Sequence, residues 1–268
     1  MFIIIKRNIL TGMMIMKKLE KSYSYVFKGI LKAVNPIKKR IIKAECKVHK
    51  FINNQSLTIL KNDGHIEVYK LMESYIDDIN AGVVWADQDL KSSNHFYNPH
   101  KNKGLYGNSN AKSECISYYT KALSEYFQGN IQSAMFHLGS TCHLIQDLTV
   151  PQHANVHLLN NHRSYENWVI KTHIHHDEFK LEEGGIYLNS LNQFVYFNSK
   201  EAICVYRKHS HIRNKHLRFQ LITSIVLTMA QATTAGLMFK FYKDIQEIDP
   251  IMILEQRNHF DSILKNSL

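Results

Sequence analysis

Imidazole and carboxylate side chains recur at helical spacing between residues 137 and 169. His143 and Asp147 are four residues apart, and His162 and Glu166 repeat that spacing further along the chain. Residues four apart lie on one face of a helix, where their side chains are close enough to share one ion. Imidazole and carboxylate ligands without a thiolate are typical of hydrolytic zinc sites. The two pairs therefore indicate a metal centre, and the competing interpretation is an ordinary polar helix surface.

Further candidate ligands surround these pairs in the sequence. His153 lies between them, just beyond Pro151, which we expect to end the first helix because proline interrupts helical hydrogen bonding. A single histidine on a helix is more often structural than ligating, so the hypothesis depends on the whole set. The remaining members lie on an upstream helical face or in a polar loop, and they are His49, Asp87, Asp89 and His95.

The composition is that of an ordinary soluble protein with one large domain. Of the 268 residues, 44% are hydrophobic and 21% are charged, and only 4 prolines and 11 glycines interrupt the chain. This scarcity of helix breakers favours long helices. The cysteines form no CxxC pair and predict no disulfide framework, and they are Cys46, Cys115, Cys142 and Cys204.

Apolar residues at helical spacing predict a single all-α domain without internal repeats. Gly64, Gly82 and Gly129 mark expected helix ends, because glycine readily terminates a helix. A segment rich in Asn, Ser, Gly and Lys has no periodicity and is predicted to be a long loop. The loop covers residues 83–110, and helices are expected over residues 41–62, 66–82, 111–130, 131–148, 164–179 and 217–245.

The segment 217–245 is long and apolar enough to resemble a membrane span. It contains Arg218, Gln220 and Gln231. Charged and amide side chains are costly in lipid. These residues therefore favour a buried core helix.

The positive charge of the chain is concentrated in its first fifty residues. The whole chain has a formal charge of +10, whereas residues 1–50 contain 13 Lys or Arg and 2 Asp or Glu, a balance of +11. The rest is close to neutral, which argues against nucleic-acid binding by the folded body.

Residues 1–43 are interpreted as a basic N-terminal extension and residues 44–268 as the folded domain. The first sixteen residues lack the features of a convincing signal peptide. From Leu19 to Val34, apolar residues recur at helical spacing between lysines. Such a helix either lies on an anionic membrane or docks on its own domain. We expect a membrane-associated or secreted protein that is a monomer.

Four segments of the chain resemble, in order and approximate spacing, those of a known family. They are WADQDLKSSNHFYNP, FHLGSTCHLIQDLTVPQHANV, HRSYENWV and AQATTAGLMFKFY. They resemble the metal-binding core of the bacterial zinc-dependent phospholipase C family, which includes the catalytic domain of clostridial alpha-toxin. The resemblance covers residues from about 45 to 245.

The resemblance implies an all-helical domain of the phospholipase C and P1 nuclease type, with three zinc ions in a cleft. It also implies hydrolysis of the glycerol-side phosphodiester bond of phospholipids to diacylglycerol and a phosphorylated headgroup. Asp87 is implied to lie beside the attacking water as the general base. The implied ligands are Asp87, His95, His143 and Asp147 for one zinc, His153, His162 and Glu166 for a second, and His49 with a bridging Asp147 for a third.

The sequence departs from the family pattern at the third zinc. Family members use an N-terminal tryptophan upstream of the position of His49, and this chain has no tryptophan there. We expect the third site to be different, weaker or absent. Glu45 and Cys46 lie one helical turn before His49, so either is a candidate replacement ligand. For Cys46 the alternative role is packing.

Two further departures bear on the substrate. Gln88 and Ser92 stand where choline-specific members have aromatic or acidic residues. A preference for phosphatidylcholine is therefore not implied. Because the sequence stops at Leu268, we expect it to lack the C-terminal β-sandwich of alpha-toxin.

Two other functions remain compatible with these residues. Zinc nucleases of the S1/P1 class share the fold, but they close the second zinc site with His-x3-Asp, whereas this chain has His162-x3-Glu166. That difference and the neutral body favour the phospholipase. The second alternative is a degenerate member that binds lipid without catalysis, and the missing tryptophan motivates it.

Overall fold

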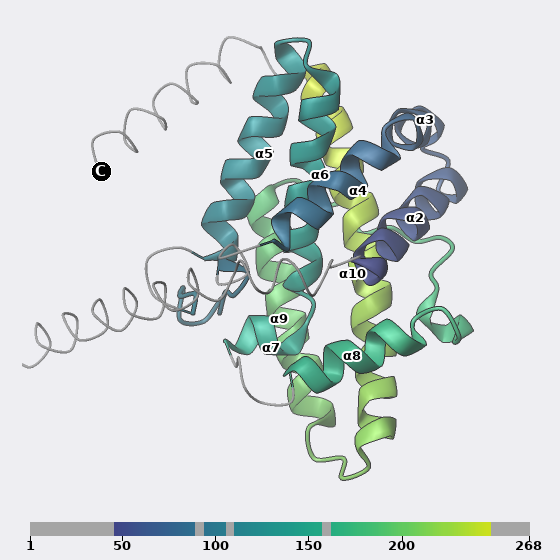
Figure 1. Ribbon diagram of the computed structural model, residues 1–268, viewed down its shortest axis with the longest axis vertical. Coiled ribbons are helices and arrows are strands. Elements are labelled where there is room, and N and C mark those ends of the chain that lie inside the picture. Colours follow the sequence, from purple (N-terminus) through teal and green to yellow (C-terminus); the bar gives the residue numbers. More distant parts are fainter. Residues whose placement is uncertain (1–45, 89–93, 106–109, 157–161, 248–268) are drawn as a thin grey trace, which may run out of the picture. The chain divides into compact units, whose positions relative to one another are not determined.

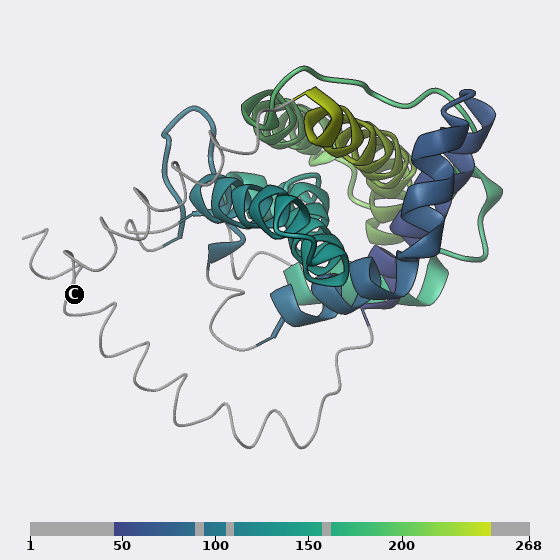
Figure 2. The ribbon, with the colours of Figure 1, turned by 90° about the horizontal axis from the view of Figure 1, so that it is seen from above.

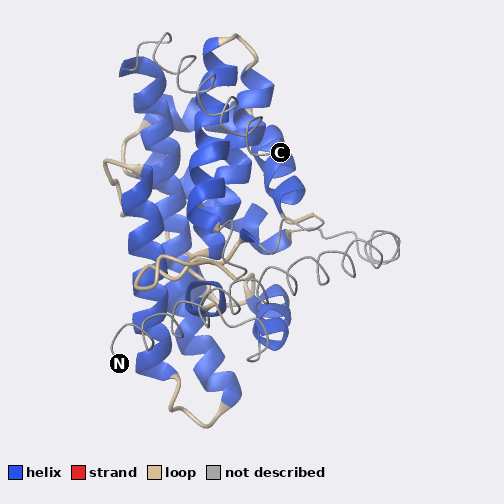
Figure 3. Ribbon diagram, turned by 90° about the vertical axis from the view of Figure 1, so that its left-hand side faces the viewer, coloured by secondary structure: helices blue, strands red, loops and turns tan. Residues whose placement is uncertain are grey.

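The computed structural model describes residues 46–88, 94–105, 110–156 and 162–247, most of which are helical (Figure 1; Figure 3). Within these ranges there is no β-strand, and an isolated antiparallel bridge joins Asn98 to Lys103. The prediction of an all-α fold is confirmed. The helices are α2 (Lys47–Asn62), α3 (Ile66–Ser74), α4 (Ile76–Ala86), α5 (Ala111–Phe127), α6 (Ile131–Asp147), α7 (Pro151–Asn155), α8 (His162–Thr172), α9 (Leu191–His209) and α10 (Lys215–Glu247), with a 3-10 turn (Asp177–Phe179) between α8 and α9.

Most residues of helix α6 are buried. It packs against α4 and α5, while the long helix α10 contacts α2, α6 and α9 (Figure 2). From Leu138 to Asp147 every residue of α6 is buried. Polar side chains on such a helix need partners, because a buried polar group without one is costly. The buried polar residues near the end of α6 therefore indicate a binding or catalytic site.

Two glycines let α4 and α6 approach each other at backbone distance. A Cβ atom at Gly82 of α4 would lie 1.8 Å from the carbonyl oxygen of Phe136, and one at Gly139 of α6 would lie 2.0 Å from that of Ile79. A larger side chain at either position would push the helices apart. The close crossing brings the end of α4 to the part of α6 that carries His143.

The prediction of a single helix over residues 66–82 is wrong in two respects. The chain forms two helices, α3 and α4, which meet at Tyr75, whose backbone angles of φ −123° and ψ 21° are not helical. Helix α4 continues past Gly82 to Ala86, so the expected loop begins later. Gly82 is needed for the close contact with α6 and does not end a helix.

Pro151 begins a helix instead of ending one, which also contradicts the prediction. Helix α6 ends at Asp147, and Pro151 is the first residue of α7, where its missing N–H group removes no helical hydrogen bond. His153 therefore lies on a short helix. Helix α9 was not predicted, although Ser190 and Gln193 form a capping box at its start.

Other predicted boundaries are confirmed. Helices α2 and α5 end two residues before Gly64 and Gly129, which have positive φ angles of 84° and 80°.

Helix α10 is long and apolar enough to cross a membrane by length and composition, but 78% of its apolar window is buried inside the fold. The prediction of a core helix is therefore confirmed.

Some expectations concern residues outside the described ranges. They include the N-terminal extension over residues 1–43 and the candidate residues Glu45, Asp89 and Ser92. These expectations stay predictions.

Candidate metal centre

The carboxylate of Asp147 is surrounded by imidazole rings from four parts of the chain. Its Oδ2 atom lies 2.7 Å from Nδ1 of His95 and 3.2 Å from Nε2 of His143. The same oxygen is 3.5 Å from Nδ1 of His153, and Oδ1 is 3.5 Å from Nε2 of His49. Helices α2, α6 and α7 and the loop before α5 thus converge on one side chain.

A second group of ligand atoms adjoins the first through His153. Nε2 of His153 lies 2.8 Å from Nε2 of His162 and 3.5 Å from Oε1 of Glu166. Oε1 of Glu166 lies 2.8 Å from Nε2 of His162, one turn away on α8. The two nitrogens of His153 therefore face two different carboxylates, so this ring links the groups.

Asp87 brings a further carboxylate to the cluster from the end of α4. One of its oxygens lies within 4.8 Å of a ring nitrogen of His95 and of His143. Oδ2 of Asp87 accepts a hydrogen bond from Sγ of Cys46, at 3.3 Å. The close crossing of α4 and α6 is what allows a residue of α4 to reach this cluster.

Two of the histidines have one ring nitrogen held by an outer partner. Nε2 of His95 lies 3.2 Å from the carbonyl oxygen of Ala86, and Nδ1 of His49 lies 2.8 Å from Oε1 of Gln146. In a neutral ring, the nitrogen that donates to such an outer oxygen carries the proton, and the other nitrogen is available to a metal ion. In both rings that other nitrogen lies on the side of Asp147.

The donor atoms and their spacing fit zinc. Ligand atoms of a tetrahedral zinc site lie roughly 3.3 Å apart, since the metal–nitrogen and metal–oxygen distances are about 2 Å. Separations of 2.7 and 3.5 Å bracket that value here. Nδ1 of His153, which lies 3.5 Å from Asp147, is buried and has no hydrogen-bond partner within the described residues, as expected of an atom that binds an ion. Three sets have ligand atoms within 4.8 Å of one another: His49, His143 and Asp147; Asp87, His95 and His143; His153, His162 and Glu166.

Burial and mutual contact shift the pKa values of these groups. Burial alone would raise the pKa of Asp147, but the surrounding histidines hold it well below its usual value. Burial alone would also raise the pKa of Glu166, but hydrogen bonds from His153 and His162 lower it to about 2. Burial disfavours the charged form of His153, yet the two carboxylates raise its pKa above the ordinary value. Both carboxylates are therefore anionic at neutral pH, as metal ligands must be.

The cluster is closed on one side and open on the other. The side chains of His95 and His143 are exposed by 4% and 0%, whereas that of Glu166 is exposed by 43%. Of these three ligand side chains, only that of Glu166 on α8 is open to solvent.

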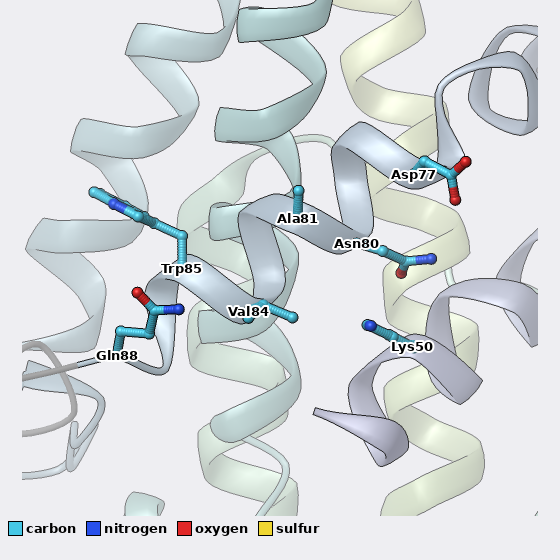
Figure 4. A pocket seen from close by; sticks show the side chains of 7 residues that line it. All are labelled: Lys50, Asp77, Asn80, Ala81, Val84, Trp85 and Gln88. Carbon is cyan, nitrogen blue, oxygen red and sulfur yellow. The ribbon is translucent and has the colours of Figure 1, made fainter. Parts of the chain in front are cut away.

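A cavity of about 490 Å³ lies between α2 and α4 (Figure 4). Lys50 lines it from α2, Asp77 and Asn80 line it from α4, and Gln88 lines it just after Asp87 in the chain. The cavity thus carries one cationic and one anionic side chain. No residue of the three ligand sets lines it, so the cavity is separate from the candidate metal centre.

Every ligand implied by the sequence resemblance belongs to one of the three sets. Gln146 and the carbonyl group of Ala86 were not predicted as parts of the site. Gln146 could have been suspected from the sequence, because it is a polar residue beside Asp147 in a helix otherwise rich in apolar and small residues. A backbone carbonyl partner leaves no side-chain signal at all.

Known proteins with similar sequences include two named phospholipases C. The one from Clostridium novyi is 22% identical over 238 residues, which covers 74% of this chain and 59% of that protein. The one from Listeria monocytogenes is 30% identical over 129 residues, which covers 45% of this chain and 44% of that protein. This chain therefore spans less than two thirds of the length of either relative.

Similar solved structures are alpha-toxins. That of Clostridium absonum has a TM-score of 0.66 and 21% identity, and the match covers 76% of this chain and 65% of the toxin. That of Clostridium perfringens has a TM-score of 0.64 and 21% identity, with 75% and 65% covered. These matches show a shared fold. The family model described as zinc-dependent phospholipase C matches residues 48–232, and the chain belongs to this family.

Proposed function

We propose that this chain is a zinc-dependent phospholipase C. It would cleave the glycerol-side phosphodiester bond of phospholipids and release diacylglycerol and a phosphorylated headgroup. The observation that carries the proposal is the convergence of four imidazole rings on the carboxylate of Asp147 in a member of this family. Residues 44–268 would form the catalytic domain, and residues 1–43 would be an extension of it.

The ligand sets support two to three zinc ions per chain. His153, His162 and Glu166 would hold one ion. Asp147 lies between the remaining sets and would bridge two further ions. Their other ligands would be Asp87, His95 and His143 for one ion and His49 for the other.

The residues of the cluster then have separate roles in hydrolysis. When bound, zinc supplies Lewis-acid chemistry that neutralises phosphoryl oxygens and lowers the pKa of water. Asp87 would take the proton of the attacking water at a carboxylate oxygen. The buried rings of His95 and His143 would exclude bulk water from the closed side, which strengthens the electrostatic interactions there. The exposed Glu166 side would admit the phosphodiester.

We propose a phospholipid at a membrane surface as the substrate and a monomer as the acting form. The similarity of this chain to the two phospholipases C supports a lipid substrate. A near-neutral body favours a lipid over a nucleic acid, because nucleic-acid binding depends on cationic contacts with phosphates.

The test measures metal content and two activities on one preparation. Purified protein is dialysed without chelator, analysed for zinc, and incubated with phospholipid and with single-stranded DNA. Zinc together with the release of diacylglycerol is the expected result. Zinc with cleavage of DNA alone would support a nuclease of the S1/P1 type. Zinc with neither activity would support the degenerate lipid-binding alternative.

A further inference from the structure

The turn between α9 and α10 carries charge of a single sign. Residues 207–218 contain five Lys or Arg and no Asp or Glu, a local balance of +5 within a body that is close to neutral as a whole. The turn forms the lower end of the fold in Figure 1. Four of the five cationic residues are exposed and the last is partly buried, and they are Arg207, Lys208, Arg213, Lys215 and Arg218.

No carboxylate among residues 162–247 pairs with any of these five cations. Arg218 donates instead to the carbonyl oxygen of Ile212, at 2.8 Å. The carboxylate of Glu178 contacts Gln220 and His176. Lysines elsewhere on the fold do have acidic partners, and these are Lys70, Lys180, Lys240 and Lys243. The turn is therefore a concentration of uncompensated positive charge.

The stability of the two helices explains only part of this charge. Arg207 and Lys208 lie in the last turn of α9, where the negative end of the helix dipole stabilises them. Lys215 begins α10, where the positive end of the dipole repels a cation, and no acidic residue offsets it in the first turn. Burial lowers the pKa of His209, and Lys208 and His211 lower it further, as expected where cations are crowded. An anionic partner would relieve this repulsion.

Exposed aliphatic side chains continue from the turn along one face of α10. Leu217 and Ile225 are exposed by 47% and 39%, and Leu221 between them is only partly buried. Residues four apart share a helix face, so the three form one stripe. Cations beside exposed aliphatic groups fit the interface of an anionic membrane. Binding to nucleic-acid phosphates depends on the cations and gains nothing from such a stripe.

One aromatic contact connects the turn to the helix that carries Glu166. The cationic groups of Lys215 and Arg218 lie over the ring of Phe219, 5.5 and 5.9 Å from its centroid. That ring packs edge-on against Tyr165 of α8, with 5.1 Å between the centroids. Tyr165 directly precedes Glu166 in α8. A membrane that contacts the turn would therefore lie close to α8.

We propose that the turn between α9 and α10, together with the stripe that begins at Leu217, docks on an anionic phospholipid surface. The cations contact lipid phosphates, and the aliphatic side chains enter the interface between headgroups and acyl chains. The inference rests on the proposed phospholipid substrate and adds a membrane contact within the folded body. This contact is separate from any contribution of residues 1–43.

Two variants of the full-length protein with equal net charge test the docking surface. The turn variant combines Arg207→Gln, Lys208→Gln and Arg213→Gln, and the control variant combines Lys61→Gln, Lys70→Gln and Lys121→Gln. The three substituted side chains of the turn make no hydrogen bond or ion pair within the described residues. Binding to vesicles of phosphatidylcholine and phosphatidylglycerol is measured by flotation in the cold, where turnover is slow.

The turn variant should bind these vesicles at least about tenfold more weakly than the wild type, because each Lys or Arg near an anionic surface contributes roughly fivefold before screening. The control variant should stay close to the wild type, and high salt should remove the difference. Equal losses in both variants would show that only net charge matters. An unchanged turn variant, or one that loses binding to single-stranded DNA alone, would overturn the membrane contact.

Failure of this inference is distinguishable from failure of the proposed function. The turn variant should keep the zinc content of the wild type and its rate on a soluble short-chain phospholipid, because none of the substituted residues belongs to a ligand set. A wild type that hydrolyses this soluble substrate while the turn variant binds vesicles normally would overturn the docking surface alone. A wild type that hydrolyses no phospholipid would overturn the proposed function.

A fluorescent reporter tests contact at the stripe itself. Leu217→Trp places an indole at an exposed position of the stripe, and Ile66→Trp places one at an exposed position of α3 as the control. Trp85 and Trp168 are present in both variants, so their emission cancels in the comparison. Vesicles should shift the emission of Leu217→Trp to shorter wavelength and leave that of Ile66→Trp unchanged. No shift for Leu217→Trp under conditions where the protein binds vesicles would overturn the proposal.

Discussion

Oε1 of Gln146 lies 2.8 Å from Nδ1 of His49, across the contact between α6 and α2. The orientation of this amide is determined by its neighbours. Asn53 donates through Nδ2 to Asn80, so its Oδ1 atom accepts from Nε2 of Gln146, at 2.8 Å. The oxygen of Gln146 must then face His49, and Nε2 of His49 is left to face Asp147. A glutamine beside the candidate ligand Asp147 thus orients the ring of another candidate ligand.

Replacing Gln146 with leucine is expected to weaken zinc binding without removing a ligand. Loss of an outer partner of a ligating histidine typically lowers metal affinity by roughly 10- to 100-fold. Competition with a chromophoric chelator measures this affinity. Gln146→Glu keeps an acceptor for Nδ1 of His49 but loses the donor to Asn53, so it should restore only part of the affinity.

The matched control for this variant is Gln231→Leu. Gln231 is also a fully buried glutamine, but it bonds to the backbone of Phe179 and Leu181, outside the three ligand sets. It should lower the melting temperature and leave zinc affinity unchanged. Equal losses of zinc affinity in both variants would show that Gln146 acts through general stability.

Zinc content is the most direct prediction. Protein dialysed without chelator should contain at least two zinc ions per chain by plasma emission, because only His143 is common to two of the three ligand sets and the set of His153, His162 and Glu166 is separate from both. A folded protein with almost no zinc, even after incubation with excess zinc, would contradict the proposed centre.

Asp147→Asn should lower the hydrolysis of phospholipid by orders of magnitude. The variant keeps the shape of the side chain but removes the negative charge that faces four imidazole rings. It should also lose zinc more readily, because an amide is a weaker ligand than a carboxylate. Both effects are measured as the rate of headgroup release and the zinc content after dialysis.

Asp244→Asn is the matched control for Asp147→Asn. Asp244 pairs with Lys240 and accepts a hydrogen bond from Tyr119, outside the ligand sets. Its loss should reduce stability and leave the zinc content and the rate per folded molecule unchanged. If Asp147→Asn hydrolyses phospholipid at the wild-type rate, the assigned role of Asp147 is wrong.

The contributions of Glu166 and His153 to the stability of the metal-free protein should both be complete only between about pH 4.5 and 6.5, the ordinary pKa values of these two groups. The pKa of Glu166 is lowered by folding, so its contribution is complete above 4.5 and is lost as the pH falls toward 2. The pKa of His153 is raised by folding, so its contribution is complete below 6.5 and is lost as the pH rises through the folded value.

Thermal unfolding in the presence of a chelator, followed across this pH range, tests the expectation. Zinc should remove the loss of stability at high pH, because it binds the deprotonated imidazoles. Glu166→Gln should make the loss at low pH smaller. Stability of the metal-free protein that increases steadily above pH 6.5 would contradict the contribution of His153.

Deletion of residues 1–35 tests whether the basic extension brings the enzyme to its substrate. Each Lys or Arg near an anionic surface contributes about 1 kcal/mol before screening by salt. The truncated protein should bind anionic vesicles more weakly, and its hydrolysis of vesicles should depend on salt less steeply, because the salt-screened attraction has been removed. Hydrolysis of a soluble short-chain phospholipid should be nearly unchanged.

Two other results of this deletion have different meanings. If the truncated protein unfolds, the segment is a structural part of the domain. If it binds vesicles as well as the full chain does, the membrane contact lies elsewhere.

The ligand pairs on single helices were predictable from the sequence alone. His143 with Asp147, and His162 with Glu166, share a face because four residues make about one helical turn, and that geometry is local. The all-α class follows from the same local periodicity. The motif resemblance extended the set to ligands outside these two helices and implied which of them share an ion.

The tertiary structure decided how the separate ligands meet. Gly82 and Gly139 looked like a helix stop and an ordinary helical residue in the sequence, yet together they let α4 and α6 cross at backbone distance. That crossing brings Asp87 to the ring of His143. Likewise, the link between Gln146 and His49 joins residues 97 positions apart. Such contacts depend on which helix faces pack together, and a local pattern of residue types does not specify the partner of a buried face.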